Sequence, residues 1–424
     1  MKRRALLISS VLPWPLHRNG GAQRTHLLRQ ALAHAGFEVD VLGVIPQPSP
    51  PLPAEPDQRR HGVVRVFPLS MDPPHRRSFS GPLGMPGRIR RQWRYRYARR
   101  SEVSHWVESR RDEYDLIMVR YLQTALVCGL DRRDPAAPPH VVVDLDDIDW
   151  LTLQSRFEAE PWPGLGGKIG MAAALHEVKG RCLRALPAFN LLYVASDADA
   201  TALRRRGVQS VVLPNIPFVD ESDPERLDPL PPAPDSRQVL FIGDLQFGPN
   251  SSGLGRFLTE CWPAVQSRVP SAQLRVAGRG LSEEKRIAWS AHPGVHILGF
   301  VENVRAEYAR CACTIAPLWW GGGTKIKVLE SVALGRPVVA TAHAARGYEV
   351  LAKRGGPVLV GESSERLTEM LMSLLTDHER IEKLAAVGPA LAREHFGPRR
   401  FQTIVAASLA SIPGDGGTPL LAVH

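Results

Sequence analysis

The feature that most constrains the fold is a repeated alternation of short apolar runs with longer amphipathic stretches. Such alternation is typical of α/β proteins, in which helices cover a parallel sheet. Several runs are apolar at consecutive positions, as expected for strands buried on both faces. The predicted strands span residues 5–11, 38–44, 63–67, 116–120, 141–145, 191–195 and 211–213 in the first half, and 239–242, 274–277, 295–298, 314–316, 337–340 and 358–360 in the second.

The length of the chain favours two such sheets. Its 424 residues exceed what a single hydrophobic core holds, since domains rarely grow beyond about 250–300 residues. Residues 222–237 are rich in Pro and Asp, which is typical of a stiff linker. We predict an N-terminal Rossmann-like domain over 1–221, the linker over 222–237, a C-terminal domain over 238–395, a helix over 396–412 that returns to the first domain, and a flexible tail over 413–424.

Composition narrows the function without fixing it. A net charge of +10 predicts attraction to polyanions such as diphosphates, anionic lipids or nucleic acid. No run approaches the roughly 18 apolar residues of a membrane-spanning helix. The five cysteines include no Cys-x-x-Cys pair, so neither a disulfide framework nor a zinc site is indicated. We expect a cytoplasmic protein.

One segment has the composition of an anion-binding loop. Gly321, Gly322 and Gly323 follow the strand predicted at 314–316 and precede a predicted helix at 324–334. Glycines allow a close approach of backbone to ligand, and a helix N-terminus presents N–H groups and a positive dipole end. Thr324 is suited to the N-cap position. Lysines oppose the dipole in a first turn, so Lys325 and Lys327 favour a negatively charged ligand there.

The same segment resembles a known family. Residues 322–340, from Gly322-Gly323-Thr324-Lys325 through Glu330 to Gly335-Arg336-Pro337, are similar to the donor-site signature of glycosyltransferase family 4. The resemblance extends over most of 236–395, through the segments at 239–244, 249–250, 274–278, 297–301 and 341–347. It implies the GT-B fold, in which two Rossmann-like domains face each other across the active site. The first half is similar mainly at residues 20–24.

The resemblance implies a role for each matching residue. Glu330 would bind the ribose hydroxyls of a nucleotide-sugar donor, and Lys325 and Lys327 would lie near its diphosphate. Phe300 and Val301 would hold the base. The other implied donor-binding positions are Gly20, Gly21, Gly243, Asn250, Gly322, Gly323 and Thr324. Many members carry a second glutamate where this chain has Gly322; a subset with Gly-Gly-Thr-basic-x-Lys followed by Glu shares this change.

The implied reaction is transfer of a sugar with retention of anomeric configuration and without a metal or another cofactor. Lys327 would stabilise the departing diphosphate. Asp146 and Asp147 end a predicted strand of the first half, where they are candidates for a general base or acceptor contact; helix capping and a metal-binding Asp-x-Asp are alternatives. Arg24, early in the first predicted helix, is placed to meet an anionic ligand, but a surface arginine is the preferred interpretation; His343 is a minor candidate for the site.

The acceptor is left open by the sequence: a glycan, a lipid-linked molecule or a small molecule. Residues 88–100, from Arg88 to Arg100, interleave arginine with Trp and Tyr, which favours contact with an anionic membrane surface over nucleic acid, since no nucleic-acid module accompanies them. An exposed arginine-rich helix is the alternative. Two other functions remain: a GT-B-type nucleotide-sugar epimerase, and a non-catalytic sugar-nucleotide-binding protein.

Overall fold

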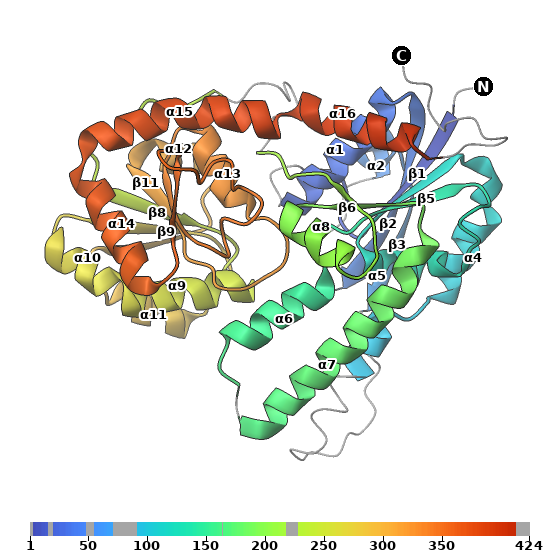
Figure 1. Cartoon of the computed structure of the whole chain (residues 1–424), viewed down its shortest axis with the longest axis horizontal. Coiled ribbons are helices and arrows are strands. Elements are labelled where there is room, and N and C mark those ends of the chain that lie inside the picture. The colour runs from blue at the N-terminus through green and yellow to red at the C-terminus, as the bar shows by residue number, and fades with distance from the viewer. Residues whose placement is uncertain are drawn as a thin grey trace. The chain divides into compact units, whose positions relative to one another are not determined.

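The computed structural model describes residues 3–15, 20–47, 55–70, 91–162, 164–217 and 228–412. The chain divides into two compact units. Unit 1 contains residues 1–214 and 398–424, and unit 2 contains residues 215–397. Each unit is built around one parallel sheet, so the predicted α/β class with two doubly wound sheets is confirmed (Figure 1).

Unit 1 has a seven-stranded sheet in the order β3-β2-β1-β4-β5-β6-β7, and every neighbouring pair is parallel. The order reverses between β1 and β4, which pair side by side although six described elements, β2 and β3 among them, separate them in sequence. The strands are β1 (Arg3–Ser9), β2 (Phe37–Gln47), β3 (Val63–Ser70), β4 (Leu116–Arg120), β5 (His140–Asp144), β6 (Leu191–Val194) and β7 (Val211–Val212).

Helices pack on this sheet through apolar faces. The core combines the alternate side chains of β1, β4 and β5 with those of α4, α5 and α7. The last helix, α16, returns to unit 1 and packs against α1 (Figure 1). The helices are α1 (Gly20–His34), α2 (Glu55–Arg60), α4 (Ser101–Ser109), α5 (Leu122–Val127), α6 (Asp149–Ala159), α7 (Gly164–Ala185), α8 (Asp197–Arg204) and α16 (Pro398–Ala410), with short 3-10 turns η2 (Arg111–Glu113), η3 (Leu130–Arg132) and η4 (Leu186–Ala188).

Unit 2 has a six-stranded parallel sheet in the order β10-β9-β8-β11-β12-β13. Here the order reverses between β8 and β11. The strands are β8 (Gln238–Ile242), β9 (Gln273–Ala277), β10 (Val295–Gly299), β11 (Cys313–Ala316), β12 (Val338–Thr341) and β13 (Val358–Gly361). The helices are α9 (Gly248–Glu260), α10 (Trp262–Arg268), α11 (Glu283–Ser290), α12 (Val304–Arg310), α13 (Ile326–Ala333), α14 (Ser364–Thr376) and α15 (His378–Phe396).

The two reversals locate the places where ligands bind in such sheets. In an open α/β sheet the crevice lies at the carboxyl ends of the strands, where the strand order reverses. In unit 1 this point is the end of β1 and β4, beside the start of α1. In unit 2 it is the end of β8 and β11, beside the start of α13.

The predicted strands all occur, with ends that differ by a few residues. Residues 228–237 of the predicted linker have no helix or strand. They are hydrogen-bonded within unit 2: Leu230 N donates to Leu334 O, and Arg336 Nη2 donates to Pro231 O. Residues 222–227 of that linker and the predicted tail at 413–424 lie outside the described residues.

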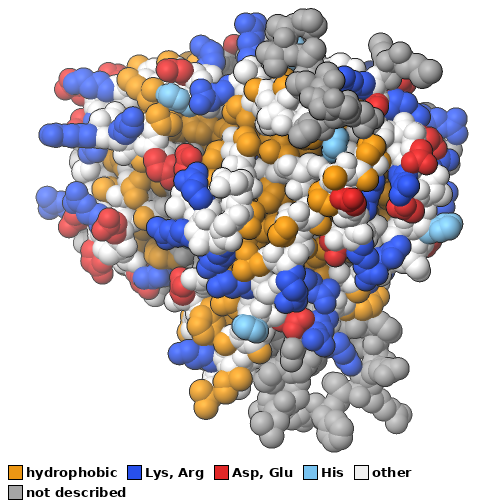
Figure 2. Space-filling model, turned by 45° about the vertical axis from the view of Figure 1, so that its right-hand side comes forward, with side chains coloured by type: hydrophobic (Ala, Val, Ile, Leu, Met, Phe, Trp, Pro, Cys, Tyr) orange, Lys and Arg blue, Asp and Glu red, His pale blue; other side chains and the backbone are white. Residues whose placement is uncertain are grey.

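Three findings bear on the class of protein. No helix among the described residues is long and apolar enough to cross a membrane. All five cysteines are buried and form no disulfide. In the part of the chain that the structure describes, no three His, Cys, Asp or Glu side chains gather into a group that could hold a metal ion. Lysine and arginine side chains are spread over the face shown in Figure 2.

Candidate functional site

The glycine loop of unit 2 connects β11 to α13 at the point where the strand order reverses. Gly321 and Gly323 have φ values of 120° and 55°, a region that side chains rarely adopt, so glycine is required there. The prediction that Thr324 caps a helix starting there is wrong. The helix α13 begins at Ile326, with Lys325 at the N-cap position and no side-chain cap, while Thr324 Oγ1 accepts a hydrogen bond from Asn215 Nδ2 at 2.9 Å.

Three side chains hold the carbonyl groups of this loop. The Lys325 ammonium group donates to the carbonyl oxygens of Gly322 and Gly323, and the side chain is only 7% exposed. His343 Nε2 lies 2.9 Å and Arg346 Nη2 lies 3.2 Å from Gly321 O. Burial, with the nearby Arg346 and Lys325, lowers the pKa of His343 to about 3, so this imidazole is neutral at pH 7. These contacts hold the loop in one conformation.

Lys327 lies in the first turn of α13 and reaches across to the end of β8. Its Nζ donates to Asn250 Oδ1 at 2.8 Å and lies 4.4 Å from the centre of the Phe241 ring. A Cβ atom on Gly243 would lie 2.5 Å from this Nζ, so only glycine leaves room for it. Burial, and secondarily the charge of Lys325, lowers the pKa of Lys327 to about 7. Glu330 opposes this fall only in part, so an anionic ligand would further stabilise the charged ammonium group.

Glu330 follows Lys327 by three residues and is half-buried. Burial raises the pKa of its carboxyl group to about 7, while Lys327 and Tyr308 oppose the rise. Because α13 begins at Ile326, Glu330 lies just over one turn into the helix. Two groups of opposite charge thus titrate near neutrality on one helix, and such perturbed groups cluster at functional sites.

The remaining predicted donor residues lie along the same edge of the sheet. Gly243 follows β8, and Gly278 follows β9. A Cβ atom on Gly278 would lie only 1.8 Å from Gly243 O, so the ends of the two strands approach closely. Asn250 Nδ2 donates to Asp244 O at 2.8 Å, which fixes the amide that contacts Lys327. Phe300 and Val301 follow β10, the edge strand, and Phe300 is 71% exposed.

The site of unit 1 is a buried network of two arginines and two aspartates. Arg24, interpreted from the sequence as a surface residue, is 1% exposed, and that interpretation is wrong. Its Nη2 and Nε atoms donate to Asp144 Oδ1 at 2.6 Å and Oδ2 at 2.8 Å. Arg120, at the end of β4, donates through Nη2 to Asp146 Oδ2 at 2.6 Å and lies 3.3 Å from Asp144 Oδ2. Each buried charge is therefore matched, as burial requires.

This network fixes the start of α1. Arg120 Nη1 donates to Gly21 O at 2.6 Å and to Thr25 Oγ1 at 3.0 Å, and Thr25 also donates to Gly21 O. Gly20 and Gly21 form the first turn of α1, beside the end of β1. The predicted glycine positions and the predicted Asp146 are therefore joined through Arg120.

Asp146 and Asp147 lie in the turn between β5 and α6. Asp146 has φ 50°, and Tyr121, which follows β4, has φ 68°; they are the non-glycine residues of the described chain with positive φ. Such conformations cost on the order of 1–3 kcal/mol and cluster at functional sites. The N-cap of α6 is Ile148, with no side-chain cap, so the capping alternative for these aspartates is wrong. Both side chains are half-buried.

The arginine-rich segment is folded inward over its described part. Residues 91–96 are helical, and Arg88 to Arg90 lie outside the described residues. Trp93 packs against the core and Tyr97 is 2% exposed. Arg96 and Arg100 lie over the rings of Trp93 and Tyr95, at 5.2 and 4.1 Å from the ring centres. The alternation of arginine with aromatic residues therefore serves intramolecular cation–π contacts here.

Comparison with known proteins gives the site its context. Residues 236–377 match the family model of glycosyl transferases group 1. Over almost its whole length the chain is similar in structure to a sucrose-phosphate synthase from Thermosynechococcus elongatus, with a TM-score of 0.64, 16% identity, and coverage of 96% of this chain and 98% of that one. TarM gives a TM-score of 0.64 at 7% identity, with 94% and 97% covered.

The chain has the GT-B glycosyltransferase fold. The likeness extends to HepE from Anabaena in complex with UDP and glucose, with a TM-score of 0.62, 17% identity, and 96% and 100% covered. In sequence, 116 residues are 32% identical to an uncharacterized 44.6 kDa protein in the cps region of Klebsiella pneumoniae, which is 26% of this chain and 30% of that protein's length. The strands β8 and β11, the glycine loop and the helix α13, which form the candidate site of unit 2, lie within the matched residues 236–377.

Several site residues were not predicted from the sequence. Arg120 stands at the end of an otherwise apolar strand, and a charged residue at that position is a signal that could have been used. Tyr121 and Tyr308 carried no such signal. The structure also assigns Lys325 to the loop carbonyl groups, whereas the sequence alone could not distinguish it from Lys327.

Proposed function

We propose that the chain is a retaining glycosyltransferase that moves a sugar from a nucleotide-diphosphate sugar to a glycan, lipid-linked or small-molecule acceptor, without a metal. One arrangement carries this proposal: Lys327 and Glu330 lie on the first turns of α13, at the strand-order reversal of a unit that matches group 1 glycosyl transferases. HepE, similar in structure, binds UDP and glucose.

The donor is held by complementary groups. In the proposed complex, Lys327 and the N–H groups at the start of α13 bind the diphosphate, since a cation and a helix N-terminus together favour negative charge. Glu330 accepts hydrogen bonds from the ribose hydroxyls. Lys325 keeps the glycine loop in the conformation that receives the diphosphate, because its ammonium group is bound to the loop carbonyls.

The reaction needs stabilisation of the leaving group more than it needs a protein nucleophile. As the bond from the sugar to the diphosphate breaks, negative charge grows on the departing phosphate oxygen, and fixed cations lower the energy of that state. In this proposal the departing oxygen accepts the proton of the acceptor hydroxyl. Asp146 or Asp147 contacts the acceptor; the strained turn that holds Asp146, fixed by Arg120, supports this assignment.

The segment from Arg88 to Arg100, described over 91–100, would contact an anionic membrane surface if the acceptor is lipid-linked. We propose such peripheral attachment on the cytoplasmic side, carried by the exposed Arg91, Arg94 and Arg99, since Trp93 and Tyr97 of this segment pack against the core. Liposome flotation with and without anionic lipid tests it, and absence of binding to both preparations removes it.

The function is tested by product analysis. The protein is incubated with a panel of nucleotide-diphosphate sugars, with and without acceptors, and the products are separated and examined by NMR. The proposal predicts that release of nucleoside diphosphate depends on an acceptor and that the new linkage has the anomeric configuration of the donor. Interconversion of donor sugars without release would show an epimerase, and binding without turnover over the whole panel would show a non-catalytic protein.

A further inference from the structure

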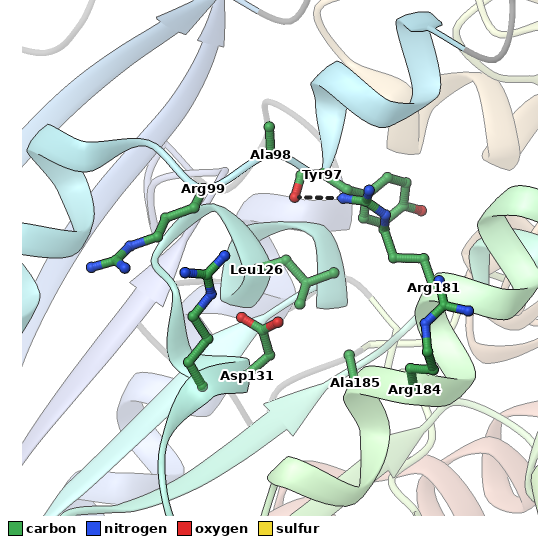
Figure 3. Close-up of a pocket in the computed structure, with 9 residues that line it drawn as sticks. Tyr97, Ala98, Arg99, Leu126, Asp131, Arg181, Arg184 and Ala185 are labelled. Carbon is green, nitrogen blue, oxygen red and sulfur yellow. Dashed lines mark hydrogen bonds between the residues drawn. The ribbon is translucent and has the colours of Figure 1, made fainter.

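A cavity of ≈ 550 Å³ lies in unit 1, apart from the Arg24–Asp144 network. Its walls come from the turn after the helical residues 91–96, from α5, from η3 and from the last turn of α7. The lining residues that matter here are Arg99, Leu126, Asp131, Arg132, Arg181 and Arg184. Figure 3 shows Arg99 on one side and Arg181 and Arg184 on the other, with Leu126 and Asp131 between them. The volume is in the range of small-molecule sites, about 300–1,000 Å³.

The charge of this cavity is strongly positive. Four arginines and one aspartate line it. Within the described residues, no carboxylate lies in ion-pair distance of any of the four arginines, whereas other arginines of the same unit, such as Arg94 and Arg111, are paired with glutamates. Four like charges around one cavity repel each other, and an anion placed among them would remove this cost.

Most donors of these guanidinium groups are not used inside the protein. Arg181 Nη1 donates to Tyr97 O at 3.3 Å, the contact dashed in Figure 3, and Arg99 Nε donates to Ser104 Oγ at 2.8 Å. Each contact uses one of the five N–H donors that a guanidinium group carries. These two contacts orient Arg99 and Arg181 and leave several N–H groups of each available to a ligand.

A purely local explanation covers only part of the cluster. Arg184 lies in the last turn of α7 and Arg181 just before it, near the helix end whose dipole favours cations, so these two need no ligand. Arg99 and Arg132 come from other segments, and no such dipole accounts for them. All four arginines nevertheless line one cavity, and this is the observation that points to a ligand.

We propose that this arginine cavity binds the phosphate group of a phosphorylated ligand. Guanidinium groups form paired hydrogen bonds with phosphate oxygens, which favours phosphate over an isolated small anion. Leu126, Ala98 and Ala185 supply apolar surface for the rest of the ligand. The phosphate is that of an anionic phospholipid or of a free phosphorylated molecule. This binding is separate from the transfer reaction, since no residue of the cavity belongs to the proposed donor or acceptor site.

The test uses the full chain with Lys327→Ala, which silences phosphate binding at the proposed donor site. Inorganic pyrophosphate is titrated by calorimetry, and vesicles of phosphatidylcholine with or without phosphatidylglycerol are used in flotation. The pocket variant is Arg132→Ala with Arg184→Ala, and the matched control is Arg204→Ala with Arg205→Ala on α8 and its end. All four arginines are exposed, so neither pair of changes removes buried contacts.

The proposal predicts binding that the pocket variant weakens about tenfold or more and that the control leaves within about twofold. Loss of pyrophosphate binding identifies a free phosphorylated ligand, and loss confined to phosphatidylglycerol vesicles identifies a lipid headgroup. Asp131→Asn removes the one negative charge, so it should tighten binding, an effect that misfolding would not produce. Absence of binding to both probes, or equal loss in the pocket and control variants, overturns the proposal.

Discussion

The affinity for the donor should depend on pH through Lys327 and Glu330 of α13. Titration of these two residues lowers the affinity at opposite ends of the pH range. The pKa of Lys327 is lowered to about 7 and that of Glu330 is raised to about 7, in both cases chiefly by burial. The lysine binds a diphosphate only when protonated, so affinity falls as the pH rises through its pKa. The glutamate accepts from ribose hydroxyls best as the carboxylate, so affinity also falls as the pH drops through its pKa.

The size of the effect follows from simple titration. Beyond either pKa, the fraction of the competent form falls about tenfold per pH unit, which corresponds to about 1.4 kcal/mol of binding free energy per unit. Affinity should therefore peak near neutrality and fall by up to about tenfold at one to two units on either side. Ligand binding reduces the fall, because a bound diphosphate raises the pKa of the lysine.

Calorimetric titration with a nucleotide-diphosphate sugar between about pH 5.5 and about pH 8.5 measures this profile. Both phosphates of such a ligand are esterified, so the ligand itself does not titrate in this range. Lys327→Arg keeps its charge and should flatten the alkaline limb, while Glu330→Gln should flatten the acidic limb. A wild-type affinity that is constant over the whole range would refute the reasoning, and so would a variant that flattens the opposite limb.

Three further predictions follow from the contacts described. Asp144→Asn leaves Arg24 and Arg120 buried with one carboxylate fewer, so the free energy of unfolding of unit 1, measured in urea, should fall by about 3–5 kcal/mol. The exposed control Glu113→Gln should lower it by less than about 1 kcal/mol. Similar small losses for both variants would contradict the importance of the network. Gly243→Ala places a Cβ atom 2.5 Å from Lys327 Nζ and should weaken nucleotide-sugar binding about tenfold. The control Gly255→Ala, whose Cβ atom would lie an ordinary 3.5 Å from Trp289, should leave binding unchanged. Equal affinities of the two variants would contradict the contact between Gly243 and Lys327. Sugar transfer should survive EDTA, and loss of activity restored by Mg²⁺ or Mn²⁺ would instead support the metal alternative for the aspartates.

The fold was predictable because its signal is repetitive. The runs at 116–119 and 239–242 are short and continuously apolar, and each became part of a largely buried strand. The strand order within each sheet was not predicted, since periodicity carries no information about which strands pair. That order places the ends of β8 and β11 side by side and so brings Gly243 next to Lys327.

The sequence indicates candidate residues for the site but not the contacts that they make. The glycine loop and the two lysines carried a clear local signal, yet the first helical residue differed by two positions because Lys325 turned back to the loop carbonyls. Arg24 was misinterpreted, since its burial depends on Asp144, 120 residues away in sequence. Partners this distant leave no trace in a local pattern.

The central claim is that Lys327 binds the diphosphate of a nucleotide sugar. The most direct test is equilibrium titration of a nucleotide-diphosphate sugar into the wild-type protein, Lys327→Ala and the control Lys383→Ala, which removes an equal charge from an exposed position on α15. A charge-assisted hydrogen bond contributes about 1.5–3 kcal/mol, so Lys327→Ala should weaken binding by about tenfold or more, and Lys383→Ala should leave it unchanged. Affinity of Lys327→Ala within a few-fold of the wild type would contradict the claim.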